Sequence, residues 1–128
     1  MHPAYLAGLI DADGSIYPLR VGNLFYPIIA LKLSQAYMIP RILKEFPGAN
    51  VQYDKKHKRA PYIINYQRKE VLRALIVSLQ PYILIKTRQL NLALLMLDNP
   101  DNSGVYADQL RFINTTPAPC PETSMSSL

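Results

Sequence analysis

The feature that most constrains this chain is a short apolar stretch near its start, in which small residues recur at every fourth position. Ala4, Gly8 and Ala12 would form one stripe of a helix that begins near Pro3, because side chains four residues apart share a helix face. Such a helix can bury its bulky side in its own domain and its small side against another backbone. A neighbour within the chain could supply that backbone, but the stretch has no second copy, which favours a symmetric partner chain.

Two aspartates, Asp11 and Asp13, end this stretch. A carboxylate in the last turn of a helix faces the negative end of the helix dipole and is disfavoured there by about 0.3–1 kcal/mol. We therefore expect a cation close to Asp13.

Length and composition restrict the class of protein. The chain of 128 residues suits a single domain with a real core. Its one cysteine, Cys120, can form no disulfide within the chain, which favours a reducing compartment. No run approaches the roughly 18 apolar residues of a membrane span, and the N-terminus is not built like a secretory signal. We expect a soluble, intracellular protein without a membrane partner, in a host that the sequence leaves open.

The basic charge is concentrated in the middle of the chain. Residues 41–73 carry nine Lys and Arg against three acidic residues, and the densest run is "KKHKR" at 55–59. A positive patch of this kind is expected of a protein that neutralises phosphates. The alternative is a solvated turn whose lysines only promote solubility.

Hydrophobic periodicity and turn signals predict an alternation of helices and strand pairs. After the first helix, strands are expected at 14–21 and 25–34, a helix at 38–46, strands at 50–55 and 61–67, and helices at 69–80, 87–98 and 101–113. Pro18 and Pro27 argue for edge positions or bulges in the first strand pair. Residues 1–113 are the predicted domain, and residues 114–128, rich in Pro, Ser and Thr, are predicted to be disordered.

The stretch "LAGLIDADG" at 6–14, together with "LSQA" at 33–36 and "LQPYILIKTRQLNL" at 79–92, resembles the LAGLIDADG homing endonucleases of the single-motif, homodimeric kind. The resemblance implies an α+β fold of order αββαββα, with a four-stranded antiparallel, saddle-shaped sheet per subunit and helices on one face. It implies a metal-dependent endonuclease, with double-stranded DNA and no small molecule as its substrate. Such an enzyme cuts both strands of a long pseudo-palindromic site across the minor groove, leaves 3′ overhangs and is typically encoded in a mobile intron.

The resemblance also assigns roles to residues. Asp13 matches the metal-binding catalytic acid, and the main-chain carbonyl of Ala12 matches a further metal contact; the metal would be Mg²⁺, with Mn²⁺ able to substitute. Gln35 and Lys86 match a residue that orients water and a basic residue at the scissile phosphate. Asp11 matches a structural position near the two-fold axis. The implied dimer interface comprises Ala4, Ala7, Gly8, Asp11 and Ala12.

Members of this family bind DNA on the concave face of the sheet, so strand parity selects candidate contacts here. The residues expected to contact DNA are Tyr17, Arg20, Asn23, Lys32, Ser34, Gln52, Asp54, Lys55, Lys56, Lys58, Arg59 and Asn65. Those at the two turns suit phosphates, and those within strands suit bases. Because the face is poor in polar groups, part of its specificity is expected from shape, water and thymine methyl contacts.

One departure from the family leaves alternatives open. Related chloroplast enzymes have an arginine four residues after the glutamine, where this chain has Ile39, followed by Pro40 and Arg41. A relative without cleavage activity, acting as an RNA-splicing cofactor or DNA-binding regulator, is therefore the main alternative. A small structural dimer is a third. On residue chemistry alone, Lys86 could be a surface lysine and Gln35 a strand-end cap.

Overall fold

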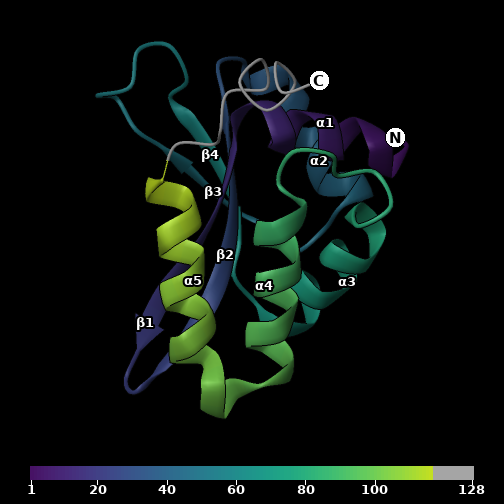
Figure 1. Cartoon of the computed structure of the whole chain (residues 1–128). Coiled ribbons are helices and arrows are strands. Elements are labelled where there is room, and N and C mark those ends of the chain that lie inside the picture. The colour runs from purple at the N-terminus through teal and green to yellow at the C-terminus, as the bar shows by residue number, and fades with distance from the viewer. Residues whose placement is uncertain (117–128) are drawn as a thin grey trace, which may run out of the picture.

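A four-stranded antiparallel sheet is covered on one face by helices (Figure 1). The structure is a computed structural model and describes residues 1–116. The helices are α1 (Pro3–Asp13), α2 (Ile39–Glu45), α3 (Lys69–Leu79), α4 (Thr87–Asp98) and α5 (Ser103–Thr115), with short 3₁₀ turns η1 (Ala36–Met38) and η2 (Pro100–Asn102). The strands are β1 (Gly14–Val21), β2 (Leu24–Leu33), β3 (Asn50–Tyr53) and β4 (Tyr62–Tyr66), in the spatial order β1-β2-β4-β3. This is the predicted α+β architecture.

Alternation along the strands separates a helix-covered face from an open face. Ile16 pairs with Ile29 and Leu31 with Ile64, and all four side chains are buried beneath the helices. Tyr66 completes this layer, and its hydroxyl donates to the Phe46 carbonyl at 2.8 Å. Burial raises the pKa of Tyr66 to about 12. The period of two therefore fixes which side chains can reach the open face.

Pro18 and Pro27 lie directly opposite each other in the β1–β2 pair. β1 is an edge strand, and β4 pairs with β2 only from Ile29 to Leu33. Neither proline therefore lies in a segment that has strands on both sides, which explains how a sheet tolerates residues without a backbone N–H.

The junction between α1 and β1 sets the position of the motif. α1 buries Leu6 and Ile10 in the core and ends at Asp13. The N–H of Gly14 donates to the Ile10 carbonyl, and a Cβ on Gly14 would lie 2.7 Å from both the Cα and the carbonyl oxygen of Ile10. Only glycine fits this close approach of the chain to its own helix.

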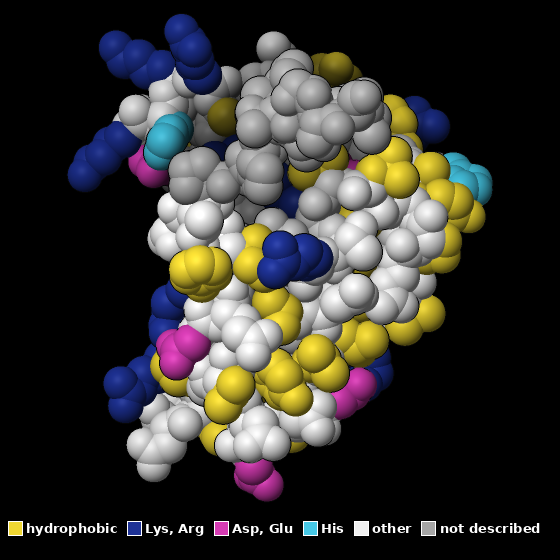
Figure 2. All heavy atoms as spheres, in the orientation of Figure 1, with side chains coloured by type: hydrophobic (Ala, Val, Ile, Leu, Met, Phe, Trp, Pro, Cys, Tyr) yellow, Lys and Arg dark blue, Asp and Glu magenta, His cyan; other side chains and the backbone are white. Residues whose placement is uncertain are grey.

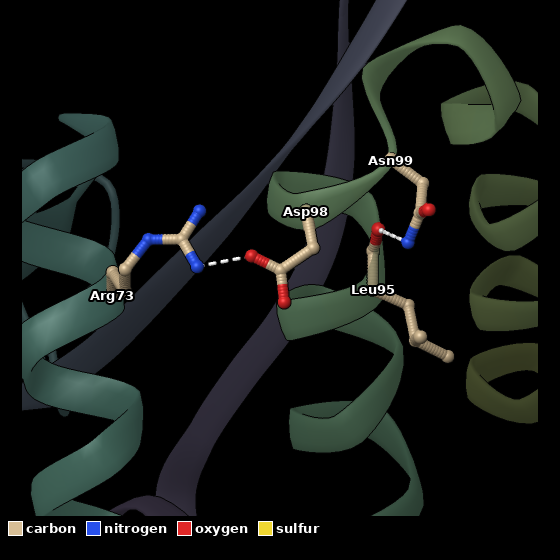
Figure 3. A network of polar contacts seen from close by, with 4 residues as sticks. All are labelled: Arg73, Leu95, Asp98 and Asn99. Atoms are coloured by element: carbon tan, nitrogen blue, oxygen red, sulfur yellow. Dashed lines mark hydrogen bonds and ion pairs between the residues drawn. The ribbon is translucent and has the colours of Figure 1, made fainter.

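Polar contacts join the outer helices to one another and to the sheet. Arg73 of α3 forms an ion pair with Asp98 at the end of α4, and the side chain of Asn99 donates to the Leu95 carbonyl at 3.0 Å (Figure 3). At the far end of α5, the Asn114 side chain donates to the Ile16 carbonyl of β1 at 2.7 Å. The α5 contact ties the last helix to an edge strand.

The last helix lies two residues further along the chain than the sequence predicted. We expected it at residues 101–113, but α5 begins at Ser103 and continues to Thr115, and Asn114 in its last turn bonds the sheet. The rest of the predicted disordered tail, residues 117–128 with Cys120, lies outside the described residues. None of the helices within residues 1–116 is both long and apolar enough to cross a membrane.

Replacing Gly14 with alanine should lower the free energy of unfolding by about 1–3 kcal/mol, because the new methyl group would overlap the Ile10 backbone. The matched control is Gly104→Ala in α5, where a Cβ would meet only the Phe25 ring, at 3.8 Å. That variant should gain about 0.4–1 kcal/mol, since alanine restricts the unfolded chain. Urea unfolding of both variants measures the difference, and equal effects would contradict the crowding described at Gly14.

Candidate functional site

The end of α1 carries the residues to which the sequence assigned chemistry. Asp13 is exposed at the last position of the helix, and within the described part of the chain no hydrogen bond or ion pair engages its side chain. The main-chain carbonyl of Ala12 belongs to the same turn, where helix carbonyls lack partners along the helix. Carboxylate and carbonyl oxygens are the donors that Mg²⁺ prefers. Among residues 1–116, no three His, Cys, Asp or Glu side chains gather to hold a metal.

Asp11 and Lys86 are joined by reciprocal contacts. The carboxylate of Asp11 accepts hydrogen bonds from the backbone N–H of Leu84, at 2.8 Å, and of Lys86, at 3.0 Å. The Lys86 ammonium donates to the main-chain carbonyl of Asp11 at 3.0 Å. A cation at this position complements the negative end of the helix dipole. Lys86 is half-buried, so it is more than a surface lysine.

Gln35, Ile39 and Arg41 lie around the start of α2. Gln35 is exposed before η1, and its side chain makes no capping hydrogen bond, so it is not a strand-end cap. Arg41 lines a small cavity with His2 and Tyr5, beside the first half of α1. Since α1 rises about 1.5 Å per residue, Arg41 lies beside the opposite end of this helix from Asp13. It does not replace the arginine that is missing at Ile39.

The small stripe of α1 is open to solvent in the single chain. Ala4, Gly8 and Ala12 are exposed, and a Cβ on Gly8 would meet nothing within 4 Å. Ala7 differs: its side chain is fully buried in the core of this chain, so including it in an exposed interface was wrong. Asp11 borders the stripe, but its carboxylate is bonded within the chain.

The open face of the sheet contains several of the predicted DNA contacts. Its members by register are Ser15, Tyr17, Leu19, Val21, Leu24, Tyr26, Ile28, Ala30, Lys32, Asn50, Gln52, Ile63 and Asn65. Tyr17, Lys32 and Gln52 are exposed. Asn65 shares this face but is buried, and its side-chain oxygen accepts from the amide of Gln67 at 2.7 Å.

Sequence reasoning omitted three polar or aromatic members of this face. Ser15, Tyr26 and Asn50 share it with Tyr17, Lys32 and Gln52 respectively. The signal that would have found them is the same two-residue step that selected their neighbours.

Basic side chains gather at the β3–β4 turn, at the end of the molecule where α1 meets β1 (Figures 1 and 2). Lys55, Lys56, Lys58 and Arg59 are all exposed there. Asp54 shapes this turn, because its carboxylate accepts the backbone N–H of Lys56 at 3.0 Å.

The remaining predicted contacts lie at strand ends. Asn23 and Ser34 are exposed beyond β1 and β2. Arg20 pairs with Phe25 and therefore shares the helix-covered side of the sheet, at its rim, where its Nε donates to the Gly22 carbonyl at 3.0 Å. A cavity of about 590 Å³ between α4 and α5 shares no lining residue with any of these positions.

The architecture of this chain matches solved structures of homing endonucleases. Over 92% of this chain and 85% of the other, it superposes on the homing endonuclease I-CvuI with a TM-score of 0.76 at 20% identity. The archaeal intron-encoded homing endonuclease I-Vdi141I, solved with DNA, gives a TM-score of 0.71 at 14% identity over 93% and 87% of the two chains. The chain has the LAGLIDADG homing endonuclease fold. No protein-family model and no curated protein matches the sequence.

A third LAGLIDADG structure bears on chain length. The meganuclease I-AabMI, bound to uncleaved DNA, matches with a TM-score of 0.70 at 15% identity, and the match covers 98% of this chain but 48% of that one. This chain therefore spans about half the length of I-AabMI. At these identities the likeness concerns the LAGLIDADG fold, and function has to be argued from the residues.

Proposed function

We propose that the protein is a homodimeric, divalent-metal-dependent, site-specific DNA endonuclease of the homing type. It would bind a long pseudo-palindromic duplex on the open faces of two sheets and cut both strands across the minor groove, leaving 3′ overhangs. A mobile intron is the genetic setting that such an activity serves.

The observation that carries this proposal is the exposed Asp13 at the end of a helix whose small residues Ala4, Gly8 and Ala12 are exposed on the single chain. In a two-fold dimer packed through Ala4, Gly8 and Ala12, the same helix end of each chain comes to the axis. Each chain then contributes one carboxylate, which suits a reaction on two strands. The solved proteins of similar fold include ones bound to DNA, with Mg or Ca present.

Asp13 and the Ala12 carbonyl would hold the metal, which we take to be Mg²⁺ with Mn²⁺ as a substitute. Both donors are oxygens at the negative end of a helix dipole, so they fit a hard cation. When bound, such a metal activates water and stabilises the leaving oxygen of a phosphodiester. The ammonium of Lys86 lies at the same helix end, where it can bind a phosphate oxygen. Gln35, with a free amide, would orient water.

The open face and the basic turn would divide the work of binding. Lys55, Lys56, Lys58 and Arg59 neutralise phosphates and supply affinity for any sequence. Tyr17, Lys32 and Gln52 project from the open face and reach base edges. Leu19 and Val21, exposed on the same face, suit thymine methyl groups.

A second function, binding without cleavage, is favoured by one observation. Ile39 stands where related chloroplast enzymes have an arginine, and Arg41 lies beside the wrong end of α1 to compensate. The protein would then act as a splicing cofactor or a DNA-binding regulator. Cleavage of a library of plasmid-borne sites, with and without Mg²⁺, separates the two functions, because only the endonuclease yields double-strand breaks.

Asp13→Asn should reduce the cleavage rate by orders of magnitude while DNA binding survives, because the substitution removes the negative charge of the side chain and preserves its shape. In EDTA the variant should be as stable as the wild type or more stable by about 0.3–1 kcal/mol, since a carboxylate at a helix C-terminus is relieved. Thermal melts and a cleavage assay in Mg²⁺ measure both effects. Asp101→Asn, an exposed acid on η2, is the control; a destabilised Asp13→Asn variant that still cuts would refute the assignment.

Gly8→Leu should convert a dimer into a folded monomer. Within one chain the new side chain meets open space, and leucine is a better helix former than glycine by about 0.8–1 kcal/mol, so the fold should survive. Against a partner helix the same side chain would overlap. Light scattering measures the molecular mass. The control for adding a leucine to a helix surface is Ala74→Leu, at an exposed position of α3. A wild-type monomer, or a dimeric Gly8→Leu variant, would contradict the proposed interface.

Lys58→Ala should change the affinity for DNA of any sequence, whereas Lys32→Ala should change the preference among bases. Loss of a phosphate contact at the turn should weaken binding to every sequence and reduce the salt slope by about one unit. Loss of Lys32 from the open face should change the base preferred at one position of each half-site. Selection from randomised duplexes measures the preference, and an unchanged profile for Lys32→Ala would show that this face does not read bases.

A further inference from the structure

The loop between α3 and α4 is held to α1 by the Asp11 side chain and, at the start of the helix, by an edge-on contact between the rings of Tyr82 and His2, whose centroids are 4.9 Å apart. Leu84 and Ile85 are 84% and 73% exposed, so their side chains contribute little burial to fix the loop. Their neighbour Ile83 is buried and anchors the loop on one side. Between Ile83 and the start of α4, the Asp11 carboxylate holds the backbone N–H groups, with one oxygen for Leu84 and the other for Lys86. The Thr87 hydroxyl donates to the carbonyls of Ile83 and Leu84, so the two backbone N–H groups depend on Asp11 and the carbonyls on Thr87.

The same pair of residues is joined in the opposite direction. Lys86 directs its ammonium to the main-chain carbonyl of Asp11, at 3.0 Å. Its backbone is thus held by the Asp11 side chain, and its side chain by the Asp11 backbone. This reciprocal arrangement fixes the position of the Lys86 backbone and the position of its ammonium group. The charge therefore ends at the backbone of the last turn of α1, the turn that also carries Asp13, two residues further along.

We propose that Asp11 is a positioning residue that places the Lys86 ammonium beside Asp13. This inference rests on the proposed endonuclease function, because Lys86 has a role in chemistry only if the site cuts a phosphodiester. Asp11 contributes neither to metal binding nor to substrate binding. Its two carboxylate oxygens fix the position of the loop. Through the loop they determine how far the Lys86 ammonium lies from a scissile phosphate.

The arrangement requires that both side-chain atoms of residue 11 accept a hydrogen bond. A carboxylate accepts at both atoms, whereas an amide of the same shape accepts at one and presents an NH₂ group at the other. In Asp11→Asn, one of the two backbone N–H groups therefore faces a donor. The loop must move at Leu84 or at Lys86, and the ammonium moves with it.

A double-mutant cycle tests whether Asp11 acts through Lys86. Single-turnover cleavage at saturating protein is measured for the wild type, Asp11→Asn, Lys86→Met and the double variant, alongside DNA affinity. Each single variant should cut about 100-fold more slowly, the scale of a displaced catalytic group, and saturating protein separates this loss from any change in DNA affinity. The double variant should be no slower than Lys86→Met. Multiplied losses would overturn the proposal, and Asp108→Asn on α5 is the matched control.

Hydrogen exchange supplies a readout that does not depend on cleavage. In Asp11→Asn, at least one of the amides of residues 84 and 86 should exchange at least tenfold faster, because the asparagine keeps an acceptor for only one of them, while the buried strand amide of Ile64 keeps its rate. In Lys86→Met, the amides of residues 84 and 86 should stay protected, because the Asp11 carboxylate still accepts both. Unchanged exchange in Asp11→Asn overturns the inference even if the protein cuts DNA.

The two proposals fail in different ways. A wild type that cuts no site with any divalent metal defeats the proposed function, while exchange still decides whether Asp11 fixes the loop. If Asp11→Asn does not fold, Asp11→Glu takes its place, because it keeps both acceptors on a side chain one methylene longer. Its cleavage should fall and, in the Lys86→Met background, show no further loss; a further loss there contradicts the proposal.

Discussion

Everything at the candidate site depends on the burial of one side of α1 and the exposure of the other. Leu6, Ala7 and Ile10 turn inward, and this fixes the rotation of the helix about its axis. With that rotation set, Gly8 must face solvent and Asp11 must border the following loop. The close approach at Gly14 then sets where the helix stops, which delivers Asp13 to the start of β1.

The sheet follows from a similar one-sided constraint. Helices cover a single face, so every strand must alternate, and the alternation leaves a surface of side chains that the core does not need. The basic turn lies on the β3–β4 hairpin together with Asn50 and Gln52 of the open face, whereas Tyr17 and Lys32 of that face lie on β1 and β2. Under the proposed function, affinity for phosphates and discrimination among bases belong to different side chains and can therefore be changed separately.

Local signals were enough to predict most of the fold. β1 and α4 have the bounds that were expected, because Gly14, the Gly22-Asn23 turn and Asn99-Pro100 are strong stop signals. The small stripe and the exposed aspartate also followed from spacing. The end of α5 did not, because its last turn is held by Asn114 bonding to a strand 98 residues away. The Asp11 contacts span 73 and 75 residues, and no local pattern predicts such pairs. Ala7 was misassigned because it and its neighbour Gly8 are both small, so residue type does not distinguish the buried position from the exposed one.

The open face has a consequence for how such a protein can change over generations. Its exposed members, among them Tyr17, Leu19 and Val21, are replaceable at little cost to folding, since surface substitutions usually alter stability by less than about 0.5 kcal/mol. Substitutions on this face are thus separated from those that would unfold the chain. Chains of quite different sequence can share this fold, as the TM-score of 0.76 at 20% identity illustrates.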